Sequence, residues 1–133
     1  MAACGVAAGA NNLGGALKNQ GKLAEAEPFY REALEINRKT LPAGHPRIAT
    51  TINNLARLLQ AQDKLDEAEP LFRESLEMRK SALPAGHPEI AQSMVNLAGL
   101  LRSQGRDEQA VPLYRQAVVD YEAKLGKDNL QVG

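Results

Sequence analysis

Apolar residues in the middle of the chain recur at the spacing of amphipathic helices. One set, separated by steps of four, three and four positions, predicts a helix over about 46–61: Ile48, Ile52, Leu55 and Leu59. A second set begins after a break near Asp63 and predicts a helix over about 65–82: Leu65, Ala68, Phe72 and Leu76. Two such helices in succession predict a helical hairpin, which is followed by the linker Leu-Pro-Ala-Gly at 83–86.

The same pattern returns every 42 residues along the chain. The markers of this period are Asn-Leu at 12–13, 54–55 and 96–97, and His-Pro at 45–46 and 87–88. Residues 11–44 and 53–86 are identical at 19 of 34 positions without a gap, so these segments are copies of one unit. A fixed period of this length is typical of a solenoid, in which each unit buries its apolar face against its neighbours.

The period divides the chain into units within a single domain over 1–133. Three units are expected at about 3–44, 45–86 and 87–128. By the same register, 129–133 are expected to begin the first helix of a fourth unit, cut short.

Residues between the helices carry signals of turns and caps. Gly21 and Gly105 are expected to end the first helix of their units in the left-handed backbone conformation, and Asp63 stands at the same position in the middle unit. His45 and His87 each precede a proline that suits the first turn of a helix, so we predict a helix-capping or packing role for both.

Composition argues against several classes of function. The 16 basic and 16 acidic residues balance, and no run of Lys or Arg forms a basic patch, so we expect no nucleic-acid partner. Cys4 is the only cysteine, which excludes an internal disulfide and a cysteine-based zinc site. No stretch reaches the roughly 20 apolar residues of a membrane helix, and 1–10 lack the pattern of a signal peptide. We therefore expect a soluble, cytoplasmic protein that does not contact a membrane.

No group of residues in the sequence predicts catalysis. The two histidines lie on different linkers, and two such residues alone fall short of a metal site, so we expect no metal site and no cofactor. Glu25 and Glu27 are two positions apart on a helix and point to different sides, unlike a catalytic carboxylate pair. We expect that the chain is not an enzyme, and an enzymatic role would require a catalytic domain outside these 133 residues.

The repeated phrase resembles the tetratricopeptide repeat. Asn-Leu-Ala in the first helix of a unit, followed by Glu-Ala-x-Pro-Leu-Phe/Tyr-Arg in the second, is similar to the pattern of that family. The 42-residue period and His-Pro-x-Ile-Ala look like the variant found in kinesin light chains. The resemblance covers nearly all of residues 11–128 and implies an all-α fold, a right-handed α-solenoid of three antiparallel helix hairpins. It also implies that the first helices line a concave groove and the second helices form the outer face.

The candidate contact residues are those on the first helices that the core does not need. Carried over by position, they are Asn11, Asn12, Lys18 and Asn19, then Thr50, Asn53, Asn54, Arg57 and Gln60, then Gln92, Val95, Asn96 and Arg102. Asparagine side chains offer both a donor and an acceptor to the backbone of an extended peptide. Alternatively, Asn12, Asn54 and Asn96 only bond to neighbouring helix backbones, and the basic residues are ordinary solvated surface.

The charges of this set predict a basic groove. Lys18, Arg57 and Arg102 are its only charged members, whereas the carboxylates concentrate on the second helices. The hypothesis is a scaffold that binds a short, acidic segment of a protein or peptide partner in the groove. The alternative is a structural spacer or self-associating array, which forms homo-oligomers through its exposed terminal helices and has no peptide ligand.

Overall fold

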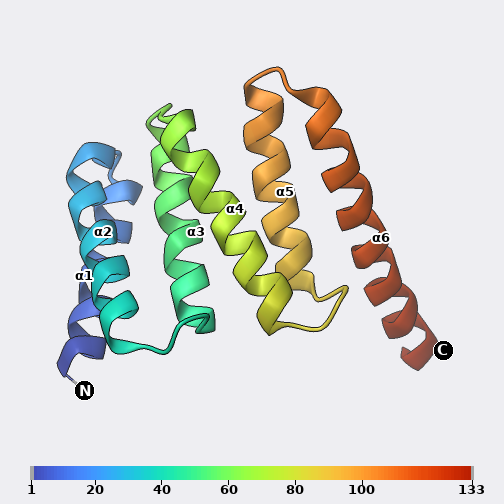
Figure 1. The fold of residues 1–133 in the computed structure, drawn as a ribbon, viewed down its shortest axis with the longest axis horizontal. Coiled ribbons are helices and arrows are strands. Elements are labelled where there is room, and N and C mark those ends of the chain that lie inside the picture. The colour runs from blue at the N-terminus through green and yellow to red at the C-terminus, as the bar shows by residue number, and fades with distance from the viewer. Residues whose placement is uncertain (1, 133) are drawn as a thin grey trace.

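The computed structural model describes the backbone of residues 2–132 and the side chains of residues 9–125. In this part of the chain the secondary structure is entirely helical (Figure 1). In chain order the helices are α1 (Ala2–Asn19), α2 (Leu23–Thr40), α3 (Pro46–Ala61), α4 (Leu65–Ala82), α5 (Pro88–Ser103) and α6 (Asp107–Val132). The bounds of α3 and α4 agree with those that the apolar spacing predicted.

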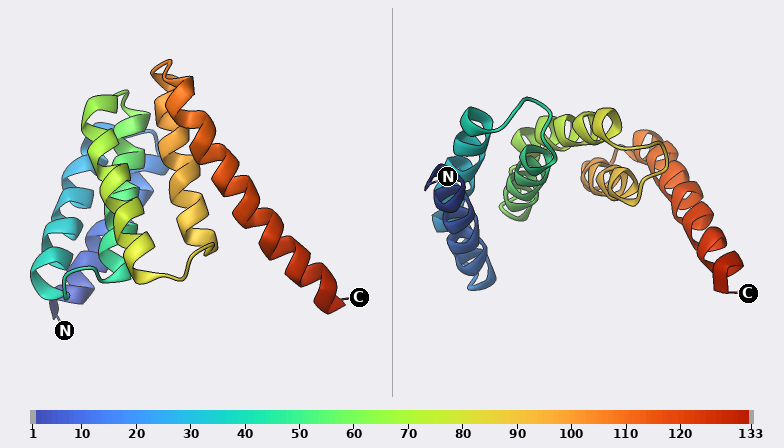
Figure 2. Two further views of the ribbon diagram at one scale, coloured as in Figure 1. Left: turned by 45° about the vertical axis from the view of Figure 1, so that its right-hand side comes forward. Right: turned by 90° about the horizontal axis from the view of Figure 1, so that it is seen from below.

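The six helices form three antiparallel hairpins stacked side by side. Each helix packs against the next one along the chain, and the contact is most extensive within the hairpins α1–α2, α3–α4 and α5–α6. Seen from below, the stack describes an arc, with α1, α3 and α5 on the inner side and α2 and α4 on the outer side (Figure 2). The prediction of an all-α solenoid built from three helix hairpins is therefore confirmed.

The tight turns within the hairpins use a left-handed backbone conformation. Gly21, Asp63 and Gly105 have φ angles of 80°, 64° and 74° and occupy the same position in successive hairpins. Glycine takes this conformation without steric cost, and aspartate is among the few side chains that tolerate it. The predicted role of these residues in ending α1, α3 and α5 is confirmed.

The two histidines cap helices, as predicted. The His45 Nδ1 atom accepts a hydrogen bond of 3.0 Å from the Arg47 amide, and His87 Nδ1 accepts one of 3.1 Å from the Glu89 amide. These bonds satisfy amides that have no partner within α3 or α5, and the prolines that follow remove a further unpaired donor. His45 and His87 therefore set where α3 and α5 begin.

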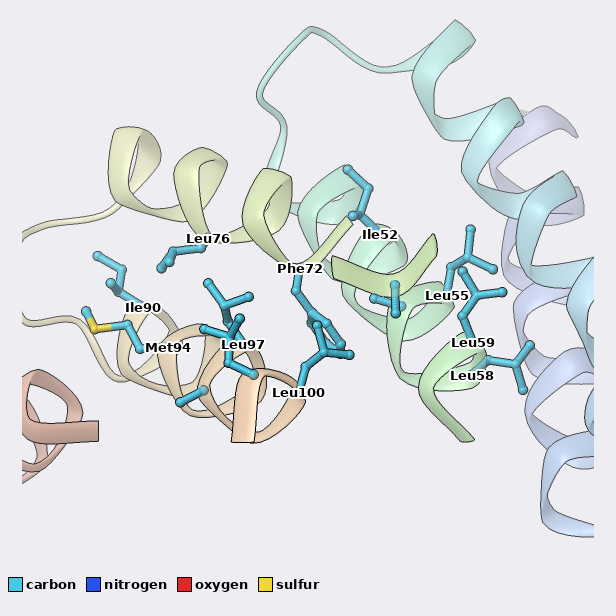
Figure 3. Packing of buried hydrophobic residues seen from close by; sticks show 14 of the residues in the cluster. Ile52, Leu55, Leu58, Leu59, Phe72, Leu76, Ile90, Met94, Leu97 and Leu100 are labelled. Atoms are coloured by element: carbon cyan, nitrogen blue, oxygen red, sulfur yellow. The ribbon is translucent and has the colours of Figure 1, made fainter. Parts of the chain in front are cut away.

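A continuous apolar core runs between the layers of the arc. Ile52 and Leu55 of α3, Phe72 of α4 and Leu97 of α5 are at most 1% exposed and belong to one cluster. Figure 3 shows the Phe72 ring pointing from α4 toward Leu100 of α5, so one side chain joins the second hairpin to the third. The core is thus shared between neighbouring hairpins, which holds the inner helices at fixed spacing.

Helix α6 differs from the prediction at its C-terminal end. It has 26 residues where α2 and α4 have 18, and it continues through the positions at which the 42-residue register places a linker. The linker phrase Leu-Pro-Ala-Gly-His-Pro is replaced at 125–130 by Leu-Gly-Lys-Asp-Asn-Leu, which has no proline to stop the helix. The prediction that 129–133 begin another helix is wrong, because the backbone of 129–132 continues α6, and Gly133 lies outside the described residues.

Candidate peptide-binding groove

The predicted contact residues lie on α1, α3 and α5, the helices along the inner side of the arc (Figure 2). We call the surface formed by these thirteen residues the groove. Six side chains are exposed: Asn12, Asn19, Thr50, Arg57, Gln92 and Arg102. Six are partly buried: Asn11, Lys18, Asn54, Gln60, Val95 and Asn96. The remaining one, Asn53, is only 4% exposed, so it is part of the floor beneath the groove.

Two asparagines of the groove connect neighbouring hairpins. The Asn96 Nδ2 atom donates a hydrogen bond of 3.1 Å to Asn53 Oδ1, which joins α5 to α3 through side chains. In the preceding pair of hairpins the equivalent residues are Asn54 and Asn11, and the Asn11 Oδ1 atom is buried without a hydrogen-bond partner. Asn96 and Asn53 thus hold the helices together, whereas Asn12 leaves its amide at the surface.

The basic residues of the groove have no carboxylate partner among the described residues. No ion pair of the described residues includes Lys18, Arg57 or Arg102. All of these ion pairs involve α2, α4 or the turns that precede α4 and α6. Partial burial lowers the pKa of Lys18, and the positive charge of Arg57 nearby lowers it further. Lys18 and Arg57 are therefore neighbours whose like charges repel, and a bound anion would relieve this repulsion.

Two tyrosine hydroxyls lie beside the groove, which the sequence reasoning missed. A Cβ atom placed on Gly15 would stand 3.6 Å from the Tyr30 hydroxyl, and one on Gly99 would stand 3.7 Å from the Tyr114 hydroxyl. In the middle hairpin the equivalent of Gly15 and Gly99 is Arg57.

The sequence contains a signal for this arrangement. Tyrosine on the outer helix accompanies glycine on the inner helix in the first and third hairpins, whereas Phe72 accompanies Arg57 in the second. Glycine leaves the space above the phenol ring open, so the hydroxyl of Tyr30 or Tyr114 reaches toward the groove. The first and third hairpins therefore present a neutral tyrosine hydroxyl where the second hairpin presents the charged Arg57 side chain.

Comparison with known proteins agrees with this geometry. The family model for the tetratricopeptide repeat matches the chain twice, at residues 5–81 and 53–123. The chain belongs to the tetratricopeptide repeat family. Repeats of this family mediate protein–protein interactions, and the proteins that carry them typically act as scaffolds without catalytic activity.

Solved structures narrow the type of tetratricopeptide repeat. BtubC (BKLC) from P. vanneervenii is 28% identical with a TM-score of 0.83, and the match covers 91% of this chain and 48% of that protein. A Podosopora anserina protein, described as a kinesin light chain with nearly identical TPR-like repeats, is 27% identical with a TM-score of 0.77 over 84% of this chain and 53% of its own. The chain therefore has repeats of the kinesin-light-chain-like type and spans about half the length of these relatives. No curated protein matches it in sequence.

Two structural features are absent from the described part of the chain. In the part of the chain whose side chains are described, no three or more His, Cys, Asp or Glu residues come together as metal ligands would. No helix among the described residues is both long and apolar enough to cross a membrane.

A partly buried carboxylate also joins neighbouring repeats on the outer side. The Glu27 carboxylate accepts hydrogen bonds from Arg31 Nε at 2.8 Å, and from Gln62 Nε2 and Lys64 Nζ at 3.0 Å each. Burial would raise the pKa of Glu27, but these hydrogen bonds outweigh burial and lower the pKa to about 2. Glu69 has the same position in the next hairpin, and there the hydrogen bond from Arg106 lowers the carboxyl pKa.

The Glu27 contacts predict a pH-dependent stability. Because the folded pKa of about 2 lies below the ordinary value of 4.5, the ionised carboxylate stabilises the fold fully above pH 4.5 and loses this effect as the pH falls toward 2. We expect Glu27→Gln to lower the free energy of unfolding by about 1 kcal/mol at pH 7, since the group is near the surface. Urea unfolding of both proteins between pH 7 and pH 2.5 would show the difference shrinking as the pH falls.

Glu25→Gln is the matched control for this experiment, because Glu25 is exposed and has no ion-pair partner among the described residues. The control variant should follow the wild type within about 0.5 kcal/mol. A Glu27→Gln deficit that stays constant across the whole pH range would contradict the assignment.

Proposed function

We propose that the chain is a protein-interaction module whose groove binds a short acidic segment of a partner protein. The observation that carries the proposal is the distribution of charge. Lys18, Arg57 and Arg102 of the groove have no ion-pair partner in the part of the chain whose side chains are described, and α1 and α3 contain no acidic residue. A nearly neutral chain thus presents a basic inner surface, which attracts anionic segments and orients them.

The groove offers complementary contacts for each part of such a segment. Arg57 can form two parallel hydrogen bonds to one carboxylate, a geometry that lysine does not provide. The Tyr30 and Tyr114 hydroxyls stand at the equivalent positions of the flanking hairpins and can accept or donate a further bond. Exposed Asn12 and half-exposed Asn54 suit the amide and carbonyl groups of an extended backbone.

Peptide selection tests this function without knowledge of the natural partner. Libraries of randomised twelve-residue peptides with acidic, neutral and basic bias would be selected on the immobilised chain at about 0.15 M salt, where charges farther apart than about 8 Å are largely screened. We expect enrichment of peptides with two or more Asp or Glu residues. Enrichment of basic or uncharged peptides instead would contradict the proposal.

A second candidate function is self-association, and the exposure of two apolar side chains favours it. Leu13 of α1 is 47% exposed and Val118 of α6 is 51% exposed, whereas the equivalent Leu55 and Leu76 in the middle hairpin are 1% and 4% exposed. The free faces of α1 and α6 thus correspond to the two sides of the contacts between hairpins. A second copy placed head to tail would bury both faces in the manner of α2 against α3.

Sedimentation over a concentration range distinguishes this assembly from a monomer. We expect self-association at high micromolar concentration, and we expect Val118→Glu to abolish it. Val119→Glu is the control, because Val119 is 56% exposed and the equivalent residues Glu35 and Glu77 are acidic. A monomer at every concentration, or equal effects of the two variants, would reject this second function.

A further inference from the structure

A cavity of about 470 Å³ lies between the third hairpin and the linker that precedes it, away from the groove. Ile90 and Met94 of α5 and Leu113 of α6 form its apolar walls, and Gly86 lies in the linker that closes one side. Figure 3 shows Ile90 and Met94 next to each other on α5, and Figure 1 shows the linker extending toward α6. The volume is within the range of about 300–1,000 Å³ that small-ligand sites occupy.

The negative charge in the cavity comes from a difference between equivalent residues of the hairpins. The position occupied by Asp120 on α6 is Ile36 on α2 and Met78 on α4. Both of these apolar side chains are half-buried, and Met78 packs against the core. A pocket of about 440 Å³ remains beside Met78 at the equivalent place in the second hairpin, so the third hairpin differs by the carboxylate and not by the open space. A Cβ atom on Gly86 would still be 3.9 Å from the Asp120 Oδ1 atom, which places the carboxylate at the wall formed by the linker.

Asp120 is a largely buried residue whose carboxylate lines the cavity without a cation partner among the described residues. It is 8% exposed, and among the described side chains it accepts one hydrogen bond, of 3.0 Å, which Gln116 Nε2 donates to Oδ1. No Lys, Arg or His of the described residues lies within 4.0 Å of it. A carboxylate has four acceptor positions, and taking it out of water is costly unless a cation or several donors satisfy it. A cation in the cavity would therefore be attracted to this side chain.

Lys80 is the other charged residue that lines the cavity. Its Nζ atom is 3.9 Å from a Glu77 carboxylate oxygen, at the limit of an ion pair, and it is not paired with Asp120. The cavity thus has apolar walls, the Asp120 carboxylate and the Lys80 ammonium group, and Lys80 is near Glu77, which does not line the cavity. This combination matches a ligand with an aliphatic stem and a positively charged end.

We propose that this cavity binds a lysine side chain of a partner protein. Its four methylene groups would lie against Ile90, Met94 and Leu113, and its ammonium group would donate hydrogen bonds to the Asp120 carboxylate and the Gln116 side-chain carbonyl. The site is separate from the groove, since none of the groove residues lines it. The proposal therefore stands independently of acidic-peptide binding.

The n-butylammonium ion is the direct probe, because it reproduces the lysine side chain from its first methylene group onward. The full chain would be titrated with it and with n-butanol, its neutral counterpart of equal size, while backbone amide shifts are followed by NMR. We expect saturable shifts around residues 85–86 and 113–120, with the cation binding at least tenfold more tightly than the alcohol. Equal binding of the two probes, or no saturable shift at these residues, would overturn the proposal.

Two substitutions sharpen the test. Asp120→Asn keeps the size of the side chain and should remove the preference for the cation. Asp120→Met restores the residue of the second hairpin and removes the carboxylate, so it should also lose the preference for the cation. Arg57→Glu in the groove should bind n-butylammonium as the wild type does. A cation preference that survives in Asp120→Asn would contradict the assignment of Asp120.

Discussion

Replacing Phe72 by alanine is expected to lower the free energy of unfolding by about 3–5 kcal/mol. The Phe72 side chain is 1% exposed and belongs to the cluster that α3, α4 and α5 share. Removing the ring leaves a cavity and also weakens the contact between the second and third hairpins. Because a solenoid is stable through such contacts between neighbours, the loss is a large part of the 5–15 kcal/mol that stabilises a typical domain.

Urea unfolding at 10 °C, followed by the helical circular dichroism signal, measures this loss. Tyr114→Ala is the matched control, since Tyr114 occupies the same position in the third hairpin and is only partly buried. Its cost should be less than half that of Phe72→Ala. If Phe72→Ala unfolds the chain completely, Phe72→Leu provides a milder change with an expected cost of about 1 kcal/mol. A Phe72→Ala cost no greater than that of Tyr114→Ala would contradict the shared core.

Reversing two charges of the groove is the second large effect. We expect Arg57→Glu together with Arg102→Glu to weaken binding of an acidic peptide from the selection described above by at least tenfold, or about 1.4 kcal/mol. The variant removes two attractive charges and adds two repulsive ones, and none of the ion pairs of the described residues is lost. Titration calorimetry with the same peptide measures the change.

The control for this variant changes the net charge equally but on α6, outside the groove. Arg115 and Lys124 of α6 are exposed and form no ion pair with a described residue, so Arg115→Glu with Lys124→Glu should reduce affinity less than threefold. Both double variants should keep the wild-type melting temperature within about 4 °C, which corresponds to surface changes below about 0.5 kcal/mol. Equal losses from the two variants would mean that net charge, and not the groove, determines binding.

The helices were predictable because their ends depend on local chemistry. Gly21 ends α1 and His45 begins α3 through contacts within a few residues, so the sequence alone identifies them. The C-terminal end of α6 was mispredicted because the 42-residue period was extended over residues that lack the linker prolines. The absence of proline at 125–130 is a local signal in the sequence, and it determines the end of α6 more strongly than the 42-residue period does.

Polar contacts between the hairpins could not be predicted, because they depend on how closely the helices approach. The Asn37 Nδ2 atom donates to Thr51 Oγ1 at 2.9 Å, and the Arg79 Nη1 atom donates to Ser93 Oγ at 2.8 Å, at equivalent positions of successive hairpins. Burial lowers the pKa of Arg79, whose side chain the pattern alone would place in solvent. The burial of Asn53 has the same origin, since α5 covers it.

The central claim is that the inner face of the arc, formed by α1, α3 and α5, is the binding surface. NMR mapping with ¹⁵N-labelled chain and a selected acidic peptide tests this claim most directly. We predict shift changes in the amides around Asn12, Lys18, Arg57 and Arg102, with those of α2 and α4 near the ion pairs Arg38–Glu74 and Arg73–Glu69 unchanged. Shift changes confined to α2, α4 and α6 would contradict the account.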